Sequence, residues 1–203
     1  MPIKVLAFAG SPRRNGNSET LLDWVLDAMR REETVDVEKI VLIDANINPC
    51  MGCNACEVLN KCIQRDGMDI LHDKIIEADV IILAAPIFCM GICSQAKALI
   101  DRFQVYFMAK YIRKSPLVIK EKRKSRLGLY LGISGMNLPY VFDGAKLTIH
   151  AFFDIIDVKY WDDLLIRDMD TIEDLTKRPE FLEEAYKKGR ELGRLLAGKE
   201  MIR

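Results

Sequence analysis

The sequence lacks several features that mark common classes of protein. Its 30 lysine and arginine residues are balanced by 30 acidic residues, so it has no net positive charge of the kind that a general nucleic-acid-binding protein carries. No apolar run reaches the roughly 20 residues of a transmembrane helix, and the first residues contain no hydrophobic region of a signal peptide. We therefore expect a cytoplasmic protein in a reducing environment, with neither nucleic acid nor membrane as a partner.

Familiar nucleotide-binding and hydrolytic motifs are also missing. No glycine-rich loop ends in the Gly-Lys-[Ser/Thr] sequence of a Walker A motif, and no G-x-G-x-x-G sequence is present. No Ser-His-Asp arrangement or pair of carboxylates indicates hydrolysis, and the chain has no internal repeat. With half of its 203 residues apolar, we expect one domain over residues 1–203.

Four of the six cysteines, in contrast, lie in one short run with the spacing C-x2-C-x2-C-x5-C: Cys50, Cys53, Cys56 and Cys62. Thiolates this close together bind metal more often than they form disulfides in a chain of this kind. The ferredoxin run C-x2-C-x2-C holds an iron–sulfur cluster, and here one loop supplies a fourth cysteine soon afterwards. A structural zinc site usually has two separated C-x2-C pairs. An iron–sulfur cluster, redox-active or free thiols, and zinc are the three interpretations of this run.

A polar loop follows the first predicted strand, at residues 3–9, and leads into a helix with apolar residues at helical spacing from Leu21. Free N–H groups at a helix N-terminus attract phosphate. The loop adds hydroxyl, amide and guanidinium donors from Ser11, Arg13, Asn17, Ser18 and Thr20. Because these are not the donors of a Walker motif, we predict that the loop binds the single terminal phosphate of a mononucleotide such as FMN. The alternative is an ordinary polar turn that caps a helix.

Strand-like and helix-like segments alternate along the rest of the chain, which is typical of a doubly wound α/β sheet. Further strands are expected at residues 35–43, 79–85, 127–133 and 158–166. We predict a doubly wound fold with five parallel strands in the order 2-1-3-4-5 and a cysteine-rich loop, residues 47–65, after the second strand. The loops after the first and third strands then lie together at the carboxyl edge, where ligands bind in open α/β sheets.

One segment is unusually basic. Residues 110–126 contain eight lysine and arginine residues against one acid, Glu121. A solvated connector is one interpretation, and a docking surface for an acidic protein or another subunit is the second, because clustered charge steers association.

Three features in this order resemble the iron–sulfur flavoproteins of anaerobes, within the NADPH-dependent FMN reductase, flavodoxin-like superfamily. They are the phosphate loop from Gly10 to Thr20, the four-cysteine run, and the third strand with its loop and following helix up to Arg102. The resemblance extends over nearly the whole chain. It implies a [4Fe–4S] cluster bound by the four cysteines and a bound FMN.

The resemblance also implies which residues bind FMN. The phosphate would be held by Ser11, Arg13, Asn15, Asn17, Ser18 and Thr20. The isoalloxazine ring would be lined by Pro86, Ile87, Phe88, Cys89, Met90 and Gly91, and its far side closed by Ser134 and Gly135. At Cys89 the family more usually has an aromatic or small residue, so a thiol in contact with the flavin is one interpretation. Two small buried side chains, Cys89 and Cys93, are the other.

The function that the resemblance implies is electron transfer between the cluster and FMN. A ferredoxin-like protein would be the electron donor, and the chain would form a homodimer or homotetramer. The alternative is a cluster-free NAD(P)H-dependent FMN or quinone reductase that uses the same flavin site.

Overall fold

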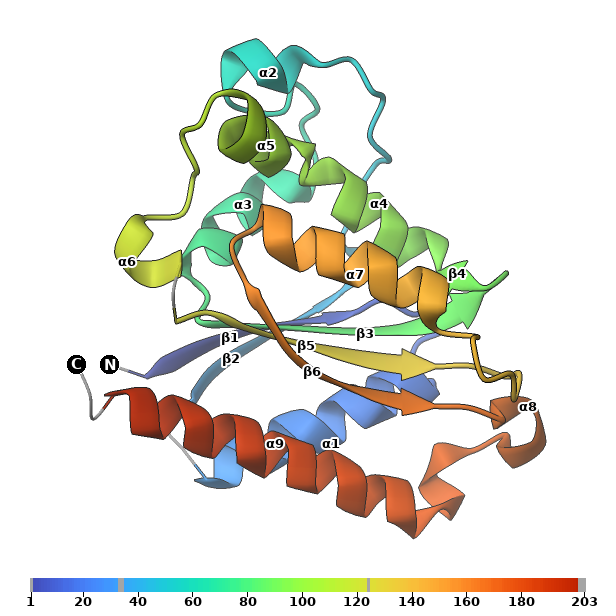
Figure 1. Ribbon diagram of the computed structural model, residues 1–203. Coiled ribbons are helices and arrows are strands. Elements are labelled where there is room, and N and C mark those ends of the chain that lie inside the picture. Colours follow the sequence, from blue (N-terminus) through green and yellow to red (C-terminus); the bar gives the residue numbers. More distant parts are fainter. Residues whose placement is uncertain (1, 33–34, 124, 201–203) are drawn as a thin grey trace.

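Five parallel strands form the centre of the fold in the computed structural model, which describes residues 2–32, 35–123 and 125–200 (Figure 1). They lie in the order β2-β1-β3-β5-β6, and every pairing along this path is parallel. Their bounds are β1 (Ile3–Ala9), β2 (Val35–Val41), β3 (Val80–Phe88), β5 (Leu127–Ile133) and β6 (Lys159–Ile166). The predicted flavodoxin-like order of five parallel strands is confirmed.

The predicted number of strands is wrong in one detail, since the sheet has six strands. The loop after β3 contains β4 (Gly91–Ile92), which pairs antiparallel with the end of β3. Only Cys89 and Met90 separate the two strands, and their φ angles are 48° and 63°. Positive φ at both positions is the requirement of a type I′ hairpin turn, which usually has Asn and Gly there. Because neither Asn nor Gly is present at these two positions, no hairpin was predicted here.

Helices cover both faces of the sheet (Figure 1). On one face lie α1 (Asn17–Glu32) and α9 (Pro179–Glu200), and on the other lie α3 (Met68–Glu77), α4 (Ser94–Arg102) and α7 (Asp143–Ile155). Side chains of a strand alternate between faces, so Val5 and Ala7 belong to the apolar cluster beneath α1 and α9, whereas Leu6 and Phe8 belong to the opposite cluster. The sheet is therefore buried on both sides, as its apolar strands predicted.

Helices α1 and α9 approach each other closely at Gly189. A Cβ atom at this position would lie 2.4 Å from the carbonyl oxygen of Val25 and 2.8 Å from the Cβ of Ala28. The flanking Ala185 and Leu192 are fully buried. The absence of a side chain at Gly189 thus sets the distance between the two helices.

Shorter elements connect this framework. The segment between β2 and α3 contains η1 (Leu42–Asp44) and α2 (Ala55–Leu59). Helix α4 is followed by α5 (Gln104–Phe107) and the π-helical turn η2 (Met108–Ile112). The others are α6 (Lys120–Arg123), α8 (Met169–Ile172) and η3 (Leu175–Lys177). Within the described ranges, no helix has both the length and the apolarity needed to cross a bilayer.

Candidate functional site

A cavity of about 770 Å³ opens at the carboxyl ends of β1, β3 and β5. This volume lies in the range of small-molecule sites, about 300–1,000 Å³. The topology brings together residues from three loops that are far apart in the sequence. Ten of the predicted FMN-binding residues line the cavity: Ser11, Arg13, Asn17, Ser18, Pro86, Ile87, Phe88, Cys89, Ser134 and Gly135.

The loop after β1 is built so that backbone groups can approach a ligand. The Gly10 N–H donates to the Ala84 carbonyl at 2.7 Å, and a Cβ at Gly10 would lie 2.9 Å from the same oxygen. Ser11 and Ser18 are buried beside the cavity, and the Ser11 hydroxyl accepts a hydrogen bond from the Arg13 N–H at 3.1 Å. Helix α1 begins at Asn17, so its first N–H groups have no acceptor within the helix. This arrangement suits an anion.

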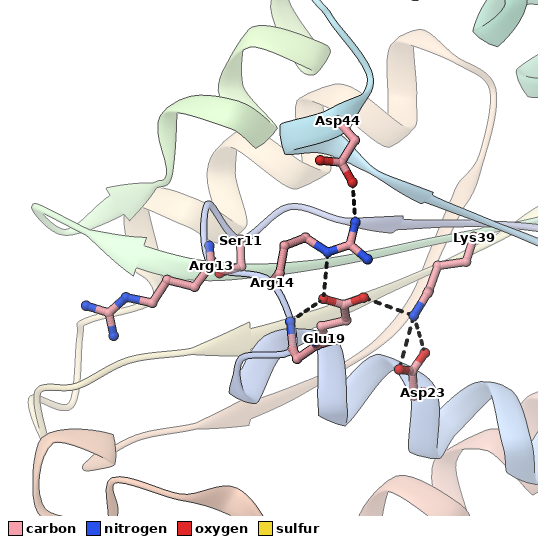
Figure 2. A network of polar contacts seen from close by, with 8 residues as sticks. Ser11, Arg13, Arg14, Glu19, Asp23, Lys39 and Asp44 are labelled. Carbon is pink, nitrogen blue, oxygen red and sulfur yellow. Dashed lines mark hydrogen bonds and ion pairs between the residues drawn. The ribbon is translucent and has the colours of Figure 1, made fainter.

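Glu19, in the first turn of α1, holds this loop in place (Figure 2). Its carboxylate is almost fully buried, accepts a hydrogen bond from the Asn15 N–H at 2.7 Å and contacts the Lys39 ammonium at 3.1 Å. Lys39 also pairs with Asp23 at 2.8 Å. Burial tends to raise the pKa of Glu19, but the hydrogen bonds from Asn15 and Lys39 outweigh it, and the pKa is lowered. An ionised Glu19 therefore ties the loop to β2, while Arg13 points away from the network (Figure 2).

Glu19 was not recognised in the sequence, although a glutamate three residues after a helix N-cap is the second half of a capping box. Here it reaches the N–H of Asn15, whose own φ is 53°.

Asn17 lies on the cavity but its side chain is already engaged. Its Nδ2 donates to the Glu173 carbonyl at 2.9 Å, and its Oδ1 accepts from the Leu175 N–H at 3.1 Å. Asn17 thus joins the start of α1 to the segment after α8. Four of the residues predicted to bind FMN lie outside the lining of the described cavity: Asn15, Thr20, Met90 and Gly91.

The segment that closes the cavity after β6 was not recognised in the sequence. Met169, Asp170 and Glu173 line it. The N–H groups of Met169 and Asp170 donate to the carbonyls of Ser134 and Gly135, at 3.0 and 3.2 Å. A Cβ at Gly135 would lie 2.2 Å from Asp170 Oδ1, so a larger residue there would displace the Asp170 side chain. No motif marks the segment, and only the pairing of β6 with β5 brings it to the site.

The two remaining cysteines occupy different environments. Cys89 is exposed, lines the cavity and lies in the strained turn between β3 and β4. Cys93 is fully buried, its thiol donates to the Gly10 carbonyl at 2.9 Å, and burial raises its pKa. Cys93 therefore fixes the start of the loop after β1. Of these two cysteines, only Cys89 lines the large cavity.

The four cysteines of loop 47–65 line a second cavity, of about 30 Å³, together with the side chain of Arg102. Gly52, with φ of 64°, turns the chain between the first two cysteines. Cys50 and Cys53 are exposed, and Cys56 and Cys62 are partly buried. Burial, and to a smaller extent the three neighbouring sulfurs, raises the pKa of Cys56.

The residues of this second cavity fit an iron–sulfur cluster in the type and number of donors, since four thiolates hold a [4Fe–4S] core. A single zinc ion would need the sulfurs to converge at about 2.3 Å from one point, and no three potential ligand side chains within the described residues are arranged in this way. By volume the cavity holds about two water molecules. It would therefore have to widen on its exposed side, at Cys50 and Cys53, to admit a cluster.

Arg102, the last residue of α4, anchors the cysteine loop from inside the protein. The side chains of Arg102 and Asp66 are each 1% exposed. They form a bidentate ion pair, with Nη1 2.5 Å from Oδ2 and Nη2 3.1 Å from Oδ1. Arg102 Nη1 also donates to the Asn48 carbonyl at 2.9 Å. Burial would raise the pKa of Asp66, but Arg102 and the N–H groups of Asn48 and Met68 lower it to about 2. The two ends of the loop are thus held by one buried ion pair.

Arg113, directly after η2, holds the middle of the same loop. Its Nη1 donates to the carbonyls of Cys56 and Glu57, at 2.6 and 2.8 Å, and its Nη2 donates to Asn60. These groups lie at the end of α2.

The basic segment 110–126 therefore makes many contacts within the chain. Lys110 pairs with Asp157 at 3.1 Å, and Arg126 is fully buried against backbone carbonyls. Lys124 lies outside the described residues. The docking interpretation of this segment remains a prediction, restricted to cations that face solvent, such as Lys114 and Lys120.

Residues 3–122 match the family model of the NADPH-dependent FMN reductases. The chain belongs to this family. It is 42% identical over 100 residues to an iron–sulfur flavoprotein of Methanocaldococcus jannaschii, covering 49% of this chain and 51% of the relative. It is 36% identical over 104 residues to an iron–sulfur flavoprotein of Archaeoglobus fulgidus, covering 51% and 47%. The matches thus span about half the length of these relatives, and the resemblance to iron–sulfur flavoproteins is confirmed.

Solved structures share the fold at lower identity. An NAD(P)H:quinone oxidoreductase from Methanothermobacter marburgensis superimposes with a TM-score of 0.66 over 95% of this chain and 98% of its own, at 17% identity. An FMN-dependent NADH-azoreductase from Bacillus anthracis, solved in complex with FMN, gives 0.63 over 97% and 100%, at 15% identity.

The region that matches the FMN reductase family contains the loop after β1, the cysteine run and the β3–β4 turn. The far wall of the large cavity, with Ser134, Gly135 and Asp170, lies beyond it.

Proposed function

We propose that this protein is an electron-transfer flavoprotein that binds FMN in the large cavity and a [4Fe–4S] cluster at the four cysteines, and passes electrons between them. The observation that carries the proposal is the position of α4. The helix starts beside the β3–β4 turn (Figure 1). It ends at Arg102, which lines the cysteine cavity. Its nine residues span about 13 Å at 1.5 Å per residue, so the two cavities lie about one helix length apart.

The residues divide into two groups with separate tasks. Ser11, Ser18 and the first N–H groups of α1 would bind the phosphate of FMN, and the β3–β4 turn would cover the ring. Arg102 and Arg113 would keep the four thiols on one side of the loop. When bound, FMN exchanges one or two electrons and thereby couples one-electron donors to two-electron acceptors.

The surface around the cysteine loop supports assembly into a homodimer or homotetramer. Large apolar side chains are exposed there, including Met51, Val58, Leu59 and Ile112, and Val58 is 85% exposed. Exposed apolar patches often mark interaction sites. A ferredoxin-like donor in the cytoplasm would approach through exposed cations such as Lys114 and Lys120, because complementary charge accelerates encounter.

Analysis of the metal and flavin content of protein purified without oxygen tests the proposal. We expect about four iron and four acid-labile sulfide per chain, as a [4Fe–4S] cluster requires, together with FMN. Replacement of Cys56 by serine should reduce iron and sulfide and leave FMN in place, whereas Cys93→Ser should leave iron and sulfide unchanged. Wild-type protein that contains FMN but neither iron nor sulfide, even after anaerobic reconstitution, would exclude the cluster.

The match to the NADPH-dependent FMN reductase family favours one alternative, a cluster-free reductase in which NAD(P)H reduces FMN directly. Stopped-flow measurement of flavin reduction separates the two functions. Rapid reduction by NADPH in iron-free protein supports the alternative, and reduction that depends on the cluster and on a one-electron donor supports electron transfer.

A further inference from the structure

The Nε group of Arg102 is a buried hydrogen-bond donor that none of the described residues accepts from. Its Nη1 and Nη2 groups donate to Asp66 and to the Asn48 carbonyl. Its Nε is buried and has no hydrogen-bond partner among the described residues. A buried donor without a partner is costly, and it is more so on a charged group. An acceptor for the Arg102 Nε–H would remove this cost.

The cysteine cavity is the place where such an acceptor can lie. Arg102 lines this cavity together with all four cysteines. Asp66 is not part of the cavity wall, so the positive member of the ion pair faces the thiols and the negative member lies behind it. Asp66 is in turn held by the N–H groups of Asn48 and Met68, both at 3.0 Å. The guanidinium is thus fixed before any ligand binds.

We propose that the Nε–H of Arg102 donates a hydrogen bond to a sulfur atom of the cluster bound at the four cysteines, and that Arg102 thereby raises the reduction potential of that cluster. The inference rests on the proposed function, because it requires the cluster. A one-electron reduction makes the cluster more negative, and a hydrogen-bond donor and a positive charge beside its sulfurs stabilise the reduced form. The same arginine therefore positions the loop and tunes the cofactor.

A purely structural role for Arg102 makes a different prediction. If the ion pair with Asp66 only fastened loop 47–65 to α4, its loss would lower stability and cluster occupancy without changing the potential of clusters that remain. The potential is therefore the readout that separates the two roles.

The test compares four proteins purified without oxygen: wild type, Arg102→Lys, the charge-balanced pair Arg102→Met with Asp66→Asn, and the control Lys97→Met. Lys97 lies on the same helix, but it is exposed and pairs with Asp101. Cluster and FMN potentials are measured in the same redox titration by electron paramagnetic resonance and visible absorption. Iron and acid-labile sulfide are determined on each sample.

For the charge-balanced pair we expect the equilibrium constant for cluster reduction to fall about tenfold, which is about 59 mV for a one-electron couple. Arg102→Lys should shift the cluster potential in the same direction. Lysine keeps the positive charge but has a methylene group in place of the Nε–H donor. The FMN potential, and both potentials of Lys97→Met, should stay at wild-type values. An unchanged cluster potential in both Arg102 variants at full iron and sulfide would refute the inference and leave the proposed function intact.

Two further outcomes are decisive. Wild-type protein without iron and sulfide overturns both the inference and the proposed function. If the Arg102 variants bind FMN but lose the cluster, Asp66→Asn alone decides, because it removes the anchor and keeps the guanidinium. A cluster retained in Asp66→Asn supports a direct contact with Arg102, and a cluster lost equally there shows that Arg102 only anchors the loop.

Discussion

Replacement of Arg126 by methionine should lower the stability of the fold substantially. Arg126 precedes β5 and is fully buried. Its Nε donates to the Ala78 carbonyl at 2.9 Å, and its two Nη groups donate to the carbonyls of Ile156 and Ile75. One side chain thus connects the start of β5 to the ends of α3 and α7. Methionine has a similar length and no donor, so it would leave three carbonyls without this partner.

The expected cost follows from opposing terms. A hydrogen bond to a charged group contributes about 1.5–3 kcal/mol, and a buried group left unpaired costs about 1–3 kcal/mol. Against this, burial of the guanidinium is itself unfavourable, and it lowers the pKa of Arg126 to about 10. A methionine avoids that desolvation and gains apolar contacts. We expect a net loss of about 3 kcal/mol, which for a chain of this size lowers Tm by about 6–12 °C.

Urea denaturation of wild type, Arg126→Met and the control Lys120→Met, all in the same FMN-loaded state, measures this difference. Lys120 is exposed in the same basic segment, so its variant should stay within about 0.5 kcal/mol of wild type. Buried ion pairs replaced by apolar residues have in some proteins increased stability. Equal or greater stability of Arg126→Met would therefore show that the guanidinium is kept here at a net cost, and it would refute our estimate.

Three further predictions concern the large cavity and the helix pair. Gly189→Leu should destabilise the protein by about 1–3 kcal/mol in urea denaturation, because its Cβ would lie 2.4 Å from the Val25 carbonyl; stability equal to wild type would show that α1 and α9 can move apart freely. Glu19→Gln should cost about 1–2 kcal/mol at neutral pH. Because the pKa of Glu19 is lowered by folding, this stabilisation is present above the pKa of the unfolded chain and is lost as pH falls through the lower pKa of the folded state, so the two proteins should converge in acid; a difference independent of pH would refute the assignment of the ionised form. Cys89→Ala should change the FMN potential, whereas Cys93→Ala should not, in a redox titration of each variant; identical potentials would place the Cys89 thiol out of contact with the ring.

The order of the sheet and the position of the large cavity could be predicted because they depend on patterns of local sequence. Apolar runs such as residues 3–9 and 127–133 indicate buried parallel strands, and the topology then puts the loops after β1 and β3 side by side. The polar loop at Ser11 and Ser18 was recognised from its composition alone. The patterns that indicate these strands and this loop each lie within about ten residues, so they can be recognised without knowledge of long-range contacts.

The features that could not be predicted arise from contacts between distant residues. The side-chain amide of Asn17, which is predicted to bind phosphate, also bonds to the carbonyl of Glu173 and the N–H of Leu175, more than 150 residues away, and no local pattern indicates these contacts. Asp170 enters the cavity wall only because β6 pairs with β5. The β3–β4 hairpin lacks the Asn-Gly signal, since its strained turn at Cys89 and Met90 is stabilised by the surrounding fold.

The basic segment 110–126 illustrates why the role of charged residues could not be predicted from the sequence. Its cations lie at the C-terminal ends of three helices, where unpaired carbonyls and the helix dipole favour positive charge. Arg113 donates to carbonyls at the end of α2, Lys122 to the Glu77 carbonyl at the end of α3, and Lys110 to the Asp154 carbonyl near the end of α7.

Arg126 donates hydrogen bonds to carbonyls at the ends of both α3 and α7. Much of the charge in this segment is therefore explained by the helices that surround it. Because Arg126 is buried and Lys122 and Lys110 are largely shielded from solvent, salt should screen these contacts far less than it screens the exposed Lys114 and Lys120. A salt dependence of electron transfer from an acidic donor would then report on the exposed cations alone.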